Sequence, residues 1–512
     1  MLVKTYGSAI FGIDAMIITI EVNVGKGSKF FLVGLPDNAV KESHERIRAA
    51  LSNVGKKFPG QRVVINMAPA DIRKEGSAYD LPIALAVLAA SKQISEDHLN
   101  DYVVMGELSL DGGIKPIKGA LPITLAAKAN GFKGVIVPFE NAAEAAIVDG
   151  IEVYGAKHIL EVCDFMDDVE TLEKVNVNQE DAFLEKLNNF DFDFSEVKGQ
   201  ENIKRALEIA AAGGHNVIMI GPPGSGKTML AKRISSILPP LTLPEAIETT
   251  KIHSVAGTMN NEASLITTRP FRSPHHTISD AGLVGGGTYP QPGEISLAQN
   301  GVLFLDELPE FKRTVLEVMR QPMEDRVVTI SRARVTVEFP ASFMLVAAMN
   351  PCPCGYYNHP EKACVCSPGA VKKYLNRISG PLFDRIDLHV EVVPVPFKDL
   401  AEALPSEKSA EIRKRVMQAR IIQSERYKES KSVHNNAQMN HNDLNKFCRL
   451  NDTGRQLLKT AMEKLNLSAR AYDRIIKVSR TIADLDQSPD INSEHLAEAI
   501  HYRSLDRDSW GE

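Results

Sequence analysis

The octet GPPGSGKT, from Gly221 to Thr228, constrains the fold of this chain more than any other stretch of its sequence. A short apolar run from Asn216 to Ile220 precedes the octet, and the residues after it have the apolar periodicity of a helix. This spacing predicts a strand, a loop and a helix, in which backbone N–H groups and the helix N-terminus converge on phosphate groups. The alternative is a glycine-rich turn before an ordinary helix.

We expect Lys227 to reach the β- and γ-phosphates of a nucleoside triphosphate, and Thr228 to bind Mg²⁺ through its hydroxyl. The predicted nucleotide-binding residues are Gly221, Pro222, Pro223, Gly224, Ser225, Gly226, Lys227 and Thr228.

A second motif, GVLFLDE, supplies the carboxylates that such a loop needs. Its four apolar residues predict a buried parallel strand that ends in acid. We expect Asp306 to hold Mg²⁺ and Glu307 to polarise the attacking water as a general base. The alternative is a buried strand with two exposed acids at its tip.

Three further polar residues are candidates for the same site. Asn350 ends the apolar run FMLVAAMN, where its amide could orient the water. Arg385 lies in SGPLFDRIDL, and Arg470 starts a predicted helix in SARAYDRII. Because a guanidinium always carries a positive charge, either arginine suits a developing phosphoryl charge. Each could instead be an ordinary ion-pair arginine.

The chain has 512 residues, too many for one hydrophobic core. The alternation of strand-like and helical patterns predicts an α/β module over 1–165, a polar linker over 166–194 and a second α/β domain over 195–396. The remainder, 397–512, has helical periodicity throughout. We predict helices there at 407–427, 453–465, 468–484 and 493–504.

The net charge of −6 gives no overall basic footprint, so a nucleic-acid contact would have to be local. The segment RVVTISRARVTVEFP alternates in period two on both sides of a basic centre and predicts a hairpin. Arg332 and Arg334 at its tip could bind phosphates of DNA, or they could form an ordinary solvated hairpin end. His275 and His276, in the insert before GVLFLDE, are candidates for a metal or phosphate ligand or for packing.

The longest apolar run, LPIALAVLAA, is far too short for a membrane span. The first residues also lack the apolar segment and cleavage site of a signal peptide. We therefore expect a soluble, cytoplasmic protein without a membrane partner.

Four of the six cysteines lie close together, as two Cys-x-Cys pairs directly after Asn350. Two closely spaced thiolate pairs suit tetrahedral, structural Zn²⁺ and do not resemble a secreted disulfide framework. The candidate ligands are Cys352, Cys354, Cys364 and Cys366, with His359 as a possible replacement for one of them. Reduced thiols without a metal are the alternative.

The order GPPGSGKT, LFLDE, AAMNP, GPLFDRIDL and SARAYDRI resembles the magnesium-chelatase-like AAA+ ATPases, and RPFRSPHHTISDAGLVGGG resembles the ComM/YifB family within them. The resemblance implies an AAA+ P-loop α/β domain followed by a helical lid domain. It also implies a homo-hexameric ring with ATP and Mg²⁺ at the subunit boundaries, acting on DNA as a branch-migration helicase in recombination or natural transformation. Arg385 would then be an arginine finger acting on the neighbouring subunit, and Arg470 a sensor-2 residue acting within its own subunit.

The N-terminal segments KEGSAYDLPIALAVLAA and GELSLDGGIKPIKGALPITLAAKANGFKGVIVP resemble the α+β domain that Lon protease shares with the DNA-repair ATPase RadA. In that alignment Leu121 stands where the catalytic lysine belongs, and Ser77 lies one place from the nucleophile position. A leucine cannot act as a base, so we expect a non-proteolytic domain. The alternative functions are a chelatase-like motor that remodels a protein partner and an ATP-dependent protease.

Overall fold

The computed structural model describes most of the chain. The described residues are 1–177, 192–259, 264–287, 289–332, 335–357, 359, 361–394, 406–430, 433–465 and 467–503. The chain forms two compact units. Unit 1 comprises Met1–Leu187, Thr242–Thr267 and Ser331–Val337, and unit 2 comprises Asn188–Leu241, Thr268–Ile330 and Glu338–Glu512. The domain boundaries expected from the sequence stay predictions, and 178–191 of the expected linker lie outside the described residues.

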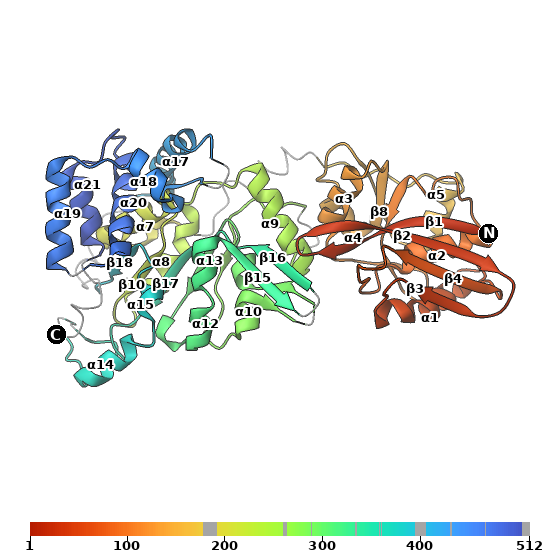
Figure 1. Ribbon diagram of the computed structural model, residues 1–512, viewed down its shortest axis with the longest axis horizontal. Helices are drawn as coiled ribbons and strands as arrows, with labels where there is room; N and C mark the ends of the chain where they lie inside the picture. The colour runs from red at the N-terminus through yellow and green to blue at the C-terminus, as the bar shows by residue number, and fades with distance from the viewer. Residues whose placement is uncertain are drawn as a thin grey trace. The chain divides into compact units, whose positions relative to one another are not determined.

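Unit 1 is built on a mixed seven-stranded sheet (Figure 1). In order across the sheet its strands are β3 (Phe30–Val33), β4 (Arg62–Ala68), β2 (Asp14–Gly25), β1 (Leu2–Phe11), β5 (Tyr102–Val104), β8 (Gly134–Pro138) and β9 (Glu152–Ala156). β1 and β2 form a long antiparallel hairpin, while β5, β8 and β9 are parallel. The buried residues of β4 alternate with partly exposed ones, as in a sheet with one face on a core. The remaining strands, β6 (Glu107–Leu108) and β7 (Ile114–Lys115), form a short separate pair.

Helix α2 (Asp80–Ala90) contains the longest apolar run of the sequence, and every one of its residues is buried. It packs on β1 and β2, and such an all-round apolar helix is typical of a position inside a core. The other helices among the described residues of unit 1 are α1 (Asn38–Asn53), α3 (Ala120–Ala129), α4 (Phe139–Ala145), α5 (Ile159–Met166) and α9 (Leu243–Ala256). Helix α9 contacts α3, so a segment that follows the phosphate loop in sequence belongs to the N-terminal unit.

Unit 2 contains a five-stranded parallel sheet. In order its strands are β11 (Phe271–Arg272), β14 (Val302–Leu305), β17 (Met344–Met349), β10 (Val217–Ile220) and β18 (Leu388–Glu391). Every residue of β10, β14 and β17 is buried, as expected of parallel strands covered on both faces. The chain leaves β10 for β11 on one side and later returns to β18 on the other. A ligand crevice lies at the carboxyl ends of strands at such a reversal.

Seven shorter helices accompany this sheet among the described residues of unit 2. They are α8 (Lys227–Arg233), α10 (Asp280–Val284), α11 (Glu294–Leu297), α12 (Arg313–Glu317), α13 (Arg320–Asp325), α14 (Pro368–Leu375) and α15 (Gly380–Phe383). Two-stranded sheets form from β15 (Val327–Arg332) with β16 (Val335–Pro340), and from β12 (Gly285–Gly286) with β13 (Gln291–Pro292). The hairpin predicted around Arg332 is therefore confirmed.

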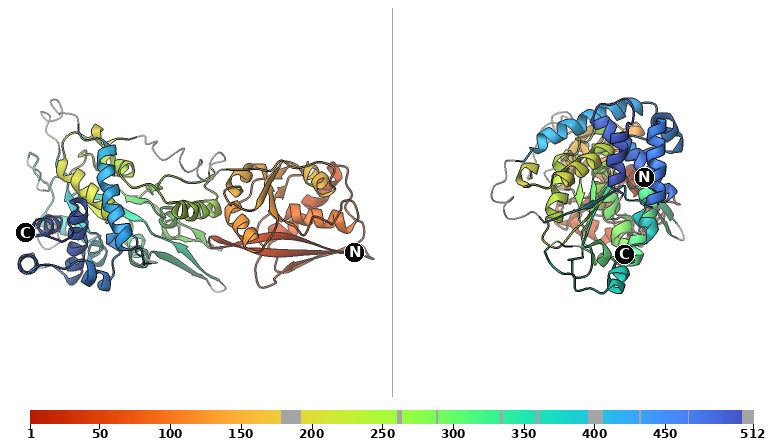
Figure 2. Two further views of the ribbon diagram at one scale, coloured as in Figure 1. Left: turned by 90° about the horizontal axis from the view of Figure 1, so that it is seen from above. Right: turned by 90° about the vertical axis from the view of Figure 1, so that its left-hand side faces the viewer.

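The C-terminal region is helical, and its blue helices gather in one group in each view (Figures 1 and 2). From residue 406 to 503, the described helices are α17 (Ser409–Arg426), α18 (His441–Phe447), α19 (Asp452–Lys464), α20 (Ala469–Leu485) and α21 (Ser493–His501). Four of them confirm the predicted helices within a few residues, and only α18 was not expected. Both α17 and α20 pack on α7 (Glu201–Gly213), so these helices share one core with the parallel sheet.

The predicted fold class is confirmed: an α/β chain with an N-terminal α+β domain, a P-loop α/β domain and a helical C-terminal domain. Within the described ranges, no helix combines the length and the hydropathy that crossing a membrane requires.

Candidate active site

The phosphate loop lies at the carboxyl end of β10, between Ile220 and the start of α8. Gly226 precedes α8 with a φ of 87°, a left-handed conformation that glycine adopts without strain. The backbone N–H groups of the first turn of α8 therefore face the loop, as anion binding requires. From the segment before α7, Gln200 donates through Nε2 to the carbonyl oxygen of Ser225 at 3.2 Å and ties that segment to the loop.

Lys227 is buried, and its ammonium lies inside the loop. Its Nζ donates to the carbonyl oxygens of Gly221 at 2.8 Å and Pro222 at 2.9 Å, and lies 3.3 Å from Oδ1 of Asn350. Burial lowers the pKa of this ammonium, while two nearby carboxylates act in the opposite direction. A desolvated ammonium interacts strongly with phosphate oxygens, because the local dielectric is low.

The two predicted Mg²⁺ ligands lie next to each other. Thr228 donates through Oγ1 to Oδ2 of Asp306 at 2.6 Å. They meet because Asp306 follows β14, which β17 separates from β10 in the sheet, and the carboxyl ends of parallel strands share one edge. A hydroxyl and a carboxylate oxygen are the hard ligands that Mg²⁺ prefers, so the residues fit this ion.

Glu307, the predicted general base, has a left-handed backbone with φ of 52° and ψ of 47°. Backbone strain at a residue other than glycine is concentrated at functional sites. Oε2 of Glu307 lies 3.7 Å from Nδ1 of His276, which comes from the insert after α9. The sequence left the role of His276 open, since no spacing rule connects it with the carboxylate. The structure places it beside the candidate base.

Asn350 follows the end of β17, and its side chain contacts Lys227 as described. This places an amide from the neighbouring strand beside the phosphate loop, where it was expected. The structure thus brings Lys227, Thr228, Asp306 and Asn350 together, with Glu307 next in the chain after Asp306.

The two predicted arginines do not join this group among the described contacts. Arg385 is 8% exposed, and its Nη2 pairs with Oε1 of Glu324 at 2.7 Å. Arg470 is exposed at the first turn of α20. One turn later, Nη1 of Arg474 lies 3.2 Å from Oδ1 of Asp387. The finger and sensor roles of Arg385 and Arg470 stay predictions.

Asp387 is the centre of a buried polar cluster that no local sequence pattern indicates. Its Oδ2 accepts from the N–H of Asn216 at 3.0 Å and lies 3.3 Å from Nδ1 of His215. Although burial opposes the charge, Arg474 and His215 hold the pKa of this carboxyl well below its usual range. The motifs FDRID and YDRII therefore meet in space through Asp387 and Arg474, a link that no sequence spacing specifies.

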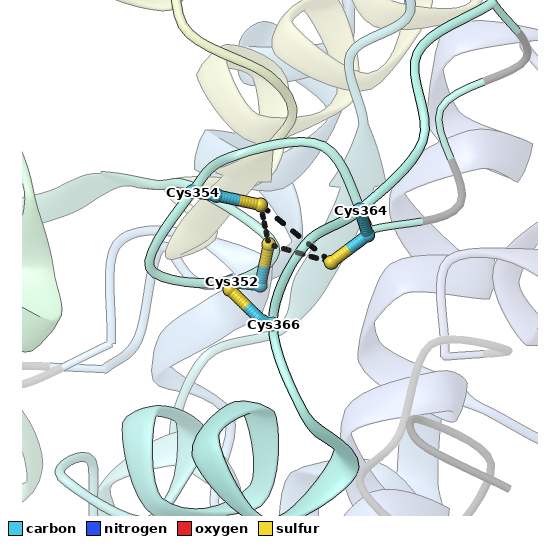
Figure 3. Close-up of side chains that lie close together, drawn as sticks. All are labelled: Cys352, Cys354, Cys364 and Cys366. Atoms are coloured by element: carbon cyan, nitrogen blue, oxygen red, sulfur yellow. Dashed lines mark hydrogen bonds between the residues drawn. The ribbon is translucent and has the colours of Figure 1, made fainter.

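The four clustered cysteines converge on one point (Figure 3). The Sγ atom of Cys352 lies 3.3 Å from that of Cys354 and 3.7 Å from that of Cys364, and the last two are 3.5 Å apart. With Cys366 included, all four sulfur atoms lie within 4.8 Å of one another. His359 uses Nδ1 to accept from the N–H groups that follow it, and the sulfur group does not include it. Backbone N–H donation lowers the pKa of the Cys354 thiol to about 6.

The arginines of the insert before β14 and those of the β15–β16 hairpin have different surroundings. Arg269 donates to the carbonyl oxygens of Pro239 and Asn300, both at 2.6 Å. Arg272 forms a bidentate pair with one carboxylate. Arg332 is exposed on β15, and Arg334 lies outside the described residues. The insert arginines thus have structural partners.

In the N-terminal unit, the position of the catalytic lysine of Lon is occupied by Leu121, which is not a base. Leu121 is buried, and its N–H donates to Oε1 of Glu144 at 2.8 Å. The hydroxyl of Ser77 donates to the carboxylate of Glu107. Because the side chain of Leu121 has no basic group, it cannot replace the lysine that activates a serine nucleophile.

Three family models match the chain. The magnesium chelatase subunit ChlI model matches 193–400, the model of subunit ChlI of Mg-chelatase matches 20–141, and the ChlI C-terminal model matches 406–503. Lon protease 2 of Bacillus subtilis is 36% identical over 125 residues, 24% of this chain and 22% of that protein.

Two relatives are similar over nearly the whole length. Competence protein ComM of Haemophilus influenzae is 45% identical over 506 residues, which cover 98% of this chain and 97% of the relative. The YifB protein of Escherichia coli is 44% identical over 503 residues, 98% of this chain and 96% of the relative. With the phosphate loop, the two carboxylates and the asparagine at one edge of a parallel sheet, this chain belongs to the magnesium-chelatase-like family of AAA+ ATPases, in the group of ComM and YifB.

Proposed function

We propose that this ATPase assembles into a homo-hexameric ring and couples ATP hydrolysis to movement on DNA, as a branch-migration helicase in recombination or natural transformation. The observation on which the hydrolysis step depends is the contact between Thr228 and Asp306 beside Lys227. Thr228 and Asp306 would hold Mg²⁺ there, and the ion would supply positive charge to neutralise the phosphates. Glu307 would accept the proton of the attacking water, and Asn350 would orient that water.

The ring is proposed because hydrolysis needs a second positive charge, which the described contacts of this site do not provide within one subunit. Among the described contacts of the site, Lys227 is the one cation, while Arg385 is paired with Glu324 in its own subunit. An arginine supplied by a neighbouring subunit stabilises the transition state of phosphoryl transfer and raises its rate by several orders of magnitude. We propose that Arg385 exchanges Glu324 for the neighbour's nucleotide when subunits assemble.

DNA is the proposed substrate for two reasons. A relative with 45% identity over almost the full chain is a competence protein. The β15–β16 hairpin also presents Arg332 at an exposed position, and repeating such a hairpin around a ring would multiply its charge.

Stimulation of ATP hydrolysis tests the proposal. We expect forked or single-stranded DNA to raise the rate, and casein or a porphyrin with Mg²⁺ to leave it unchanged. Stimulation by the porphyrin mixture would favour the chelatase-like motor, which the three ChlI family models support. ATP-dependent hydrolysis of casein would favour a protease. If DNA neither binds nor stimulates, the helicase proposal fails.

In addition to ATP and Mg²⁺, we propose one structural Zn²⁺ at the cysteine cluster. Three of the sulfur atoms are 3.3 to 3.7 Å apart and the fourth lies within 4.8 Å of them, close to the edge of a tetrahedron with Zn–S bonds of about 2.3 Å, which is about 3.8 Å. A disulfide would need a separation of about 2.05 Å. The four thiols therefore fit a closed metal site without an open catalytic position.

A further inference from the structure

The cysteine loop touches the phosphate loop. Gly355, directly after Cys354, packs against the ring of Pro223, and a methyl group added at Gly355 would lie 2.5 Å from Cδ of that proline. Gly355 has a φ of 83°, which glycine adopts and other residues adopt only with strain. The turn between the two cysteine pairs therefore starts in direct contact with the backbone that would surround the phosphates.

The same loop is joined to the asparagine of the site. Cys352 is fully buried and lies two positions after Asn350, whose side chain contacts Lys227. With one residue between them, a shift of Cys352 would move Asn350 as well. The cysteine cluster is therefore joined to Asn350 through one intervening residue, and it packs on the phosphate loop through Gly355.

The end of the loop reaches the turn after the candidate base. Ser367 follows Cys366 and caps α14, accepting from the N–H of Ala370 at 3.3 Å. Just beyond α14, Arg377 donates to the carbonyl oxygen of Pro309 at 3.2 Å and to Oε2 of Glu310 at 2.8 Å. Pro309 and Glu310 belong to the short helix that begins directly after Glu307.

We infer that a zinc ion bound by Cys352, Cys354, Cys364 and Cys366 positions the phosphate loop and Asn350, so that zinc occupancy sets the affinity for ATP. The inference rests on the proposed ATPase function and on the proposed zinc site. The cysteines are positioning residues here, because they would act through Gly355 on Pro223 and through the chain on Asn350. Without the ion, four thiols have no strong attraction that would keep this long loop closed, and the Gly355 contact with Pro223 would loosen.

Metal content tests the site itself. The full chain, purified without chelator, should contain one zinc per chain, and the Cys364→Ser/Cys366→Ser variant should contain none. Cys163→Ala is the matched control, since Cys163 is a buried thiol outside the cluster and its replacement should leave the zinc in place. A chain without metal, or a double variant that keeps its zinc, would overturn the inference.

Nucleotide binding tests the positioning role with every cysteine intact. Gly355→Ala should retain zinc and raise the Kd for a fluorescent, non-hydrolysable ATP analogue about tenfold, as expected for a strained residue that displaces its neighbour. Gly369→Ala is the control, because a methyl group there meets nothing within 4 Å. It should retain both zinc and affinity.

A zinc-free wild-type chain, prepared with a thiol-reactive mercurial and then thiol, should show the same loss, and added zinc should restore the affinity. Hydrogen exchange of Gly221–Thr228 should rise in parallel. If Gly355→Ala or the zinc-free chain binds the analogue as tightly as wild type, the positioning role is refuted. A zinc-loaded wild-type chain that binds no ATP would instead refute the proposed function.

Discussion

The ion pair of the partly buried Arg474 with the buried Asp387 should hold the C-terminal helices on the parallel sheet. Arg474 comes from α20, and Asp387 precedes β18. Arg474→Ala removes the guanidinium and leaves a carboxylate that is 1% exposed without its main countercharge. Its other polar partners, the N–H of Asn216 and the ring of His215, remain in place.

Breaking a buried pair by removing one partner costs about 3 to 5 kcal/mol, because the charge left behind is not solvated. We expect a value near the lower end, about 3 kcal/mol, since the side chain of Arg474 is 20% exposed and Asp387 keeps a backbone donor. In a large unit this corresponds to a fall in melting temperature of roughly 5 °C.

Urea unfolding monitored by circular dichroism would measure the loss, with Asp387→Asn and the double variant completing a thermodynamic cycle. The double variant should be less destabilised than the sum of the single ones, because neither charge is then left alone. Arg455→Ala is the control: Arg455 pairs with the fully exposed Asp452 on α19 and should have no measurable effect. Additive single effects, or an Arg474→Ala chain as stable as the control, would refute the reasoning.

Three other predictions concern the site and the core. Lys227→Ala should abolish binding of ATP, measured by isothermal calorimetry, whereas Lys232→Ala on the exposed side of α8 should not. Glu307→Gln should still bind ATP but slow its hydrolysis about a hundredfold or more, and undiminished turnover would show that another residue is the base. Burial lowers the pKa of His215 and of His389, so below about pH 6.5 the unfolded chain takes up protons that the folded chain does not. Stability should therefore fall by roughly 1 to 3 kcal/mol between about pH 7.5 and about pH 5.5, and urea midpoints that do not fall would contradict this.

The residues that the sequence located well are those whose position follows from local geometry. The spacing of the octet fixes Lys227 and Thr228 relative to the loop. Asp306 and Asn350 each end an apolar strand, and carboxyl ends of parallel strands share an edge, so their meeting could be anticipated. Four of the described helices after residue 406 were predictable from their periodicity, whereas the short α18 was not.

Other contacts could not be anticipated, because they depend on which distant segments pack together. Nothing in the local pattern joins Asp387 to Arg474 or His276 to Glu307. The cysteine spacing predicted a metal site, but only the packing of Gly355 on Pro223 connects that site with the phosphate loop.

Helix α9 also limits how this protein can be divided. Its Ser254 bonds to the carboxylate of Glu144, and the N–H of Gly119 donates to the carbonyl oxygen of Ser254 at 3.2 Å. A truncation that begins at residue 195 would keep α9 but strip away the surface that covers it. Such a fragment would expose to solvent the surface of α9 that packs on the N-terminal unit. Exchange of N-terminal modules between relatives therefore requires that α9 be exchanged with the module, and a single junction is not enough.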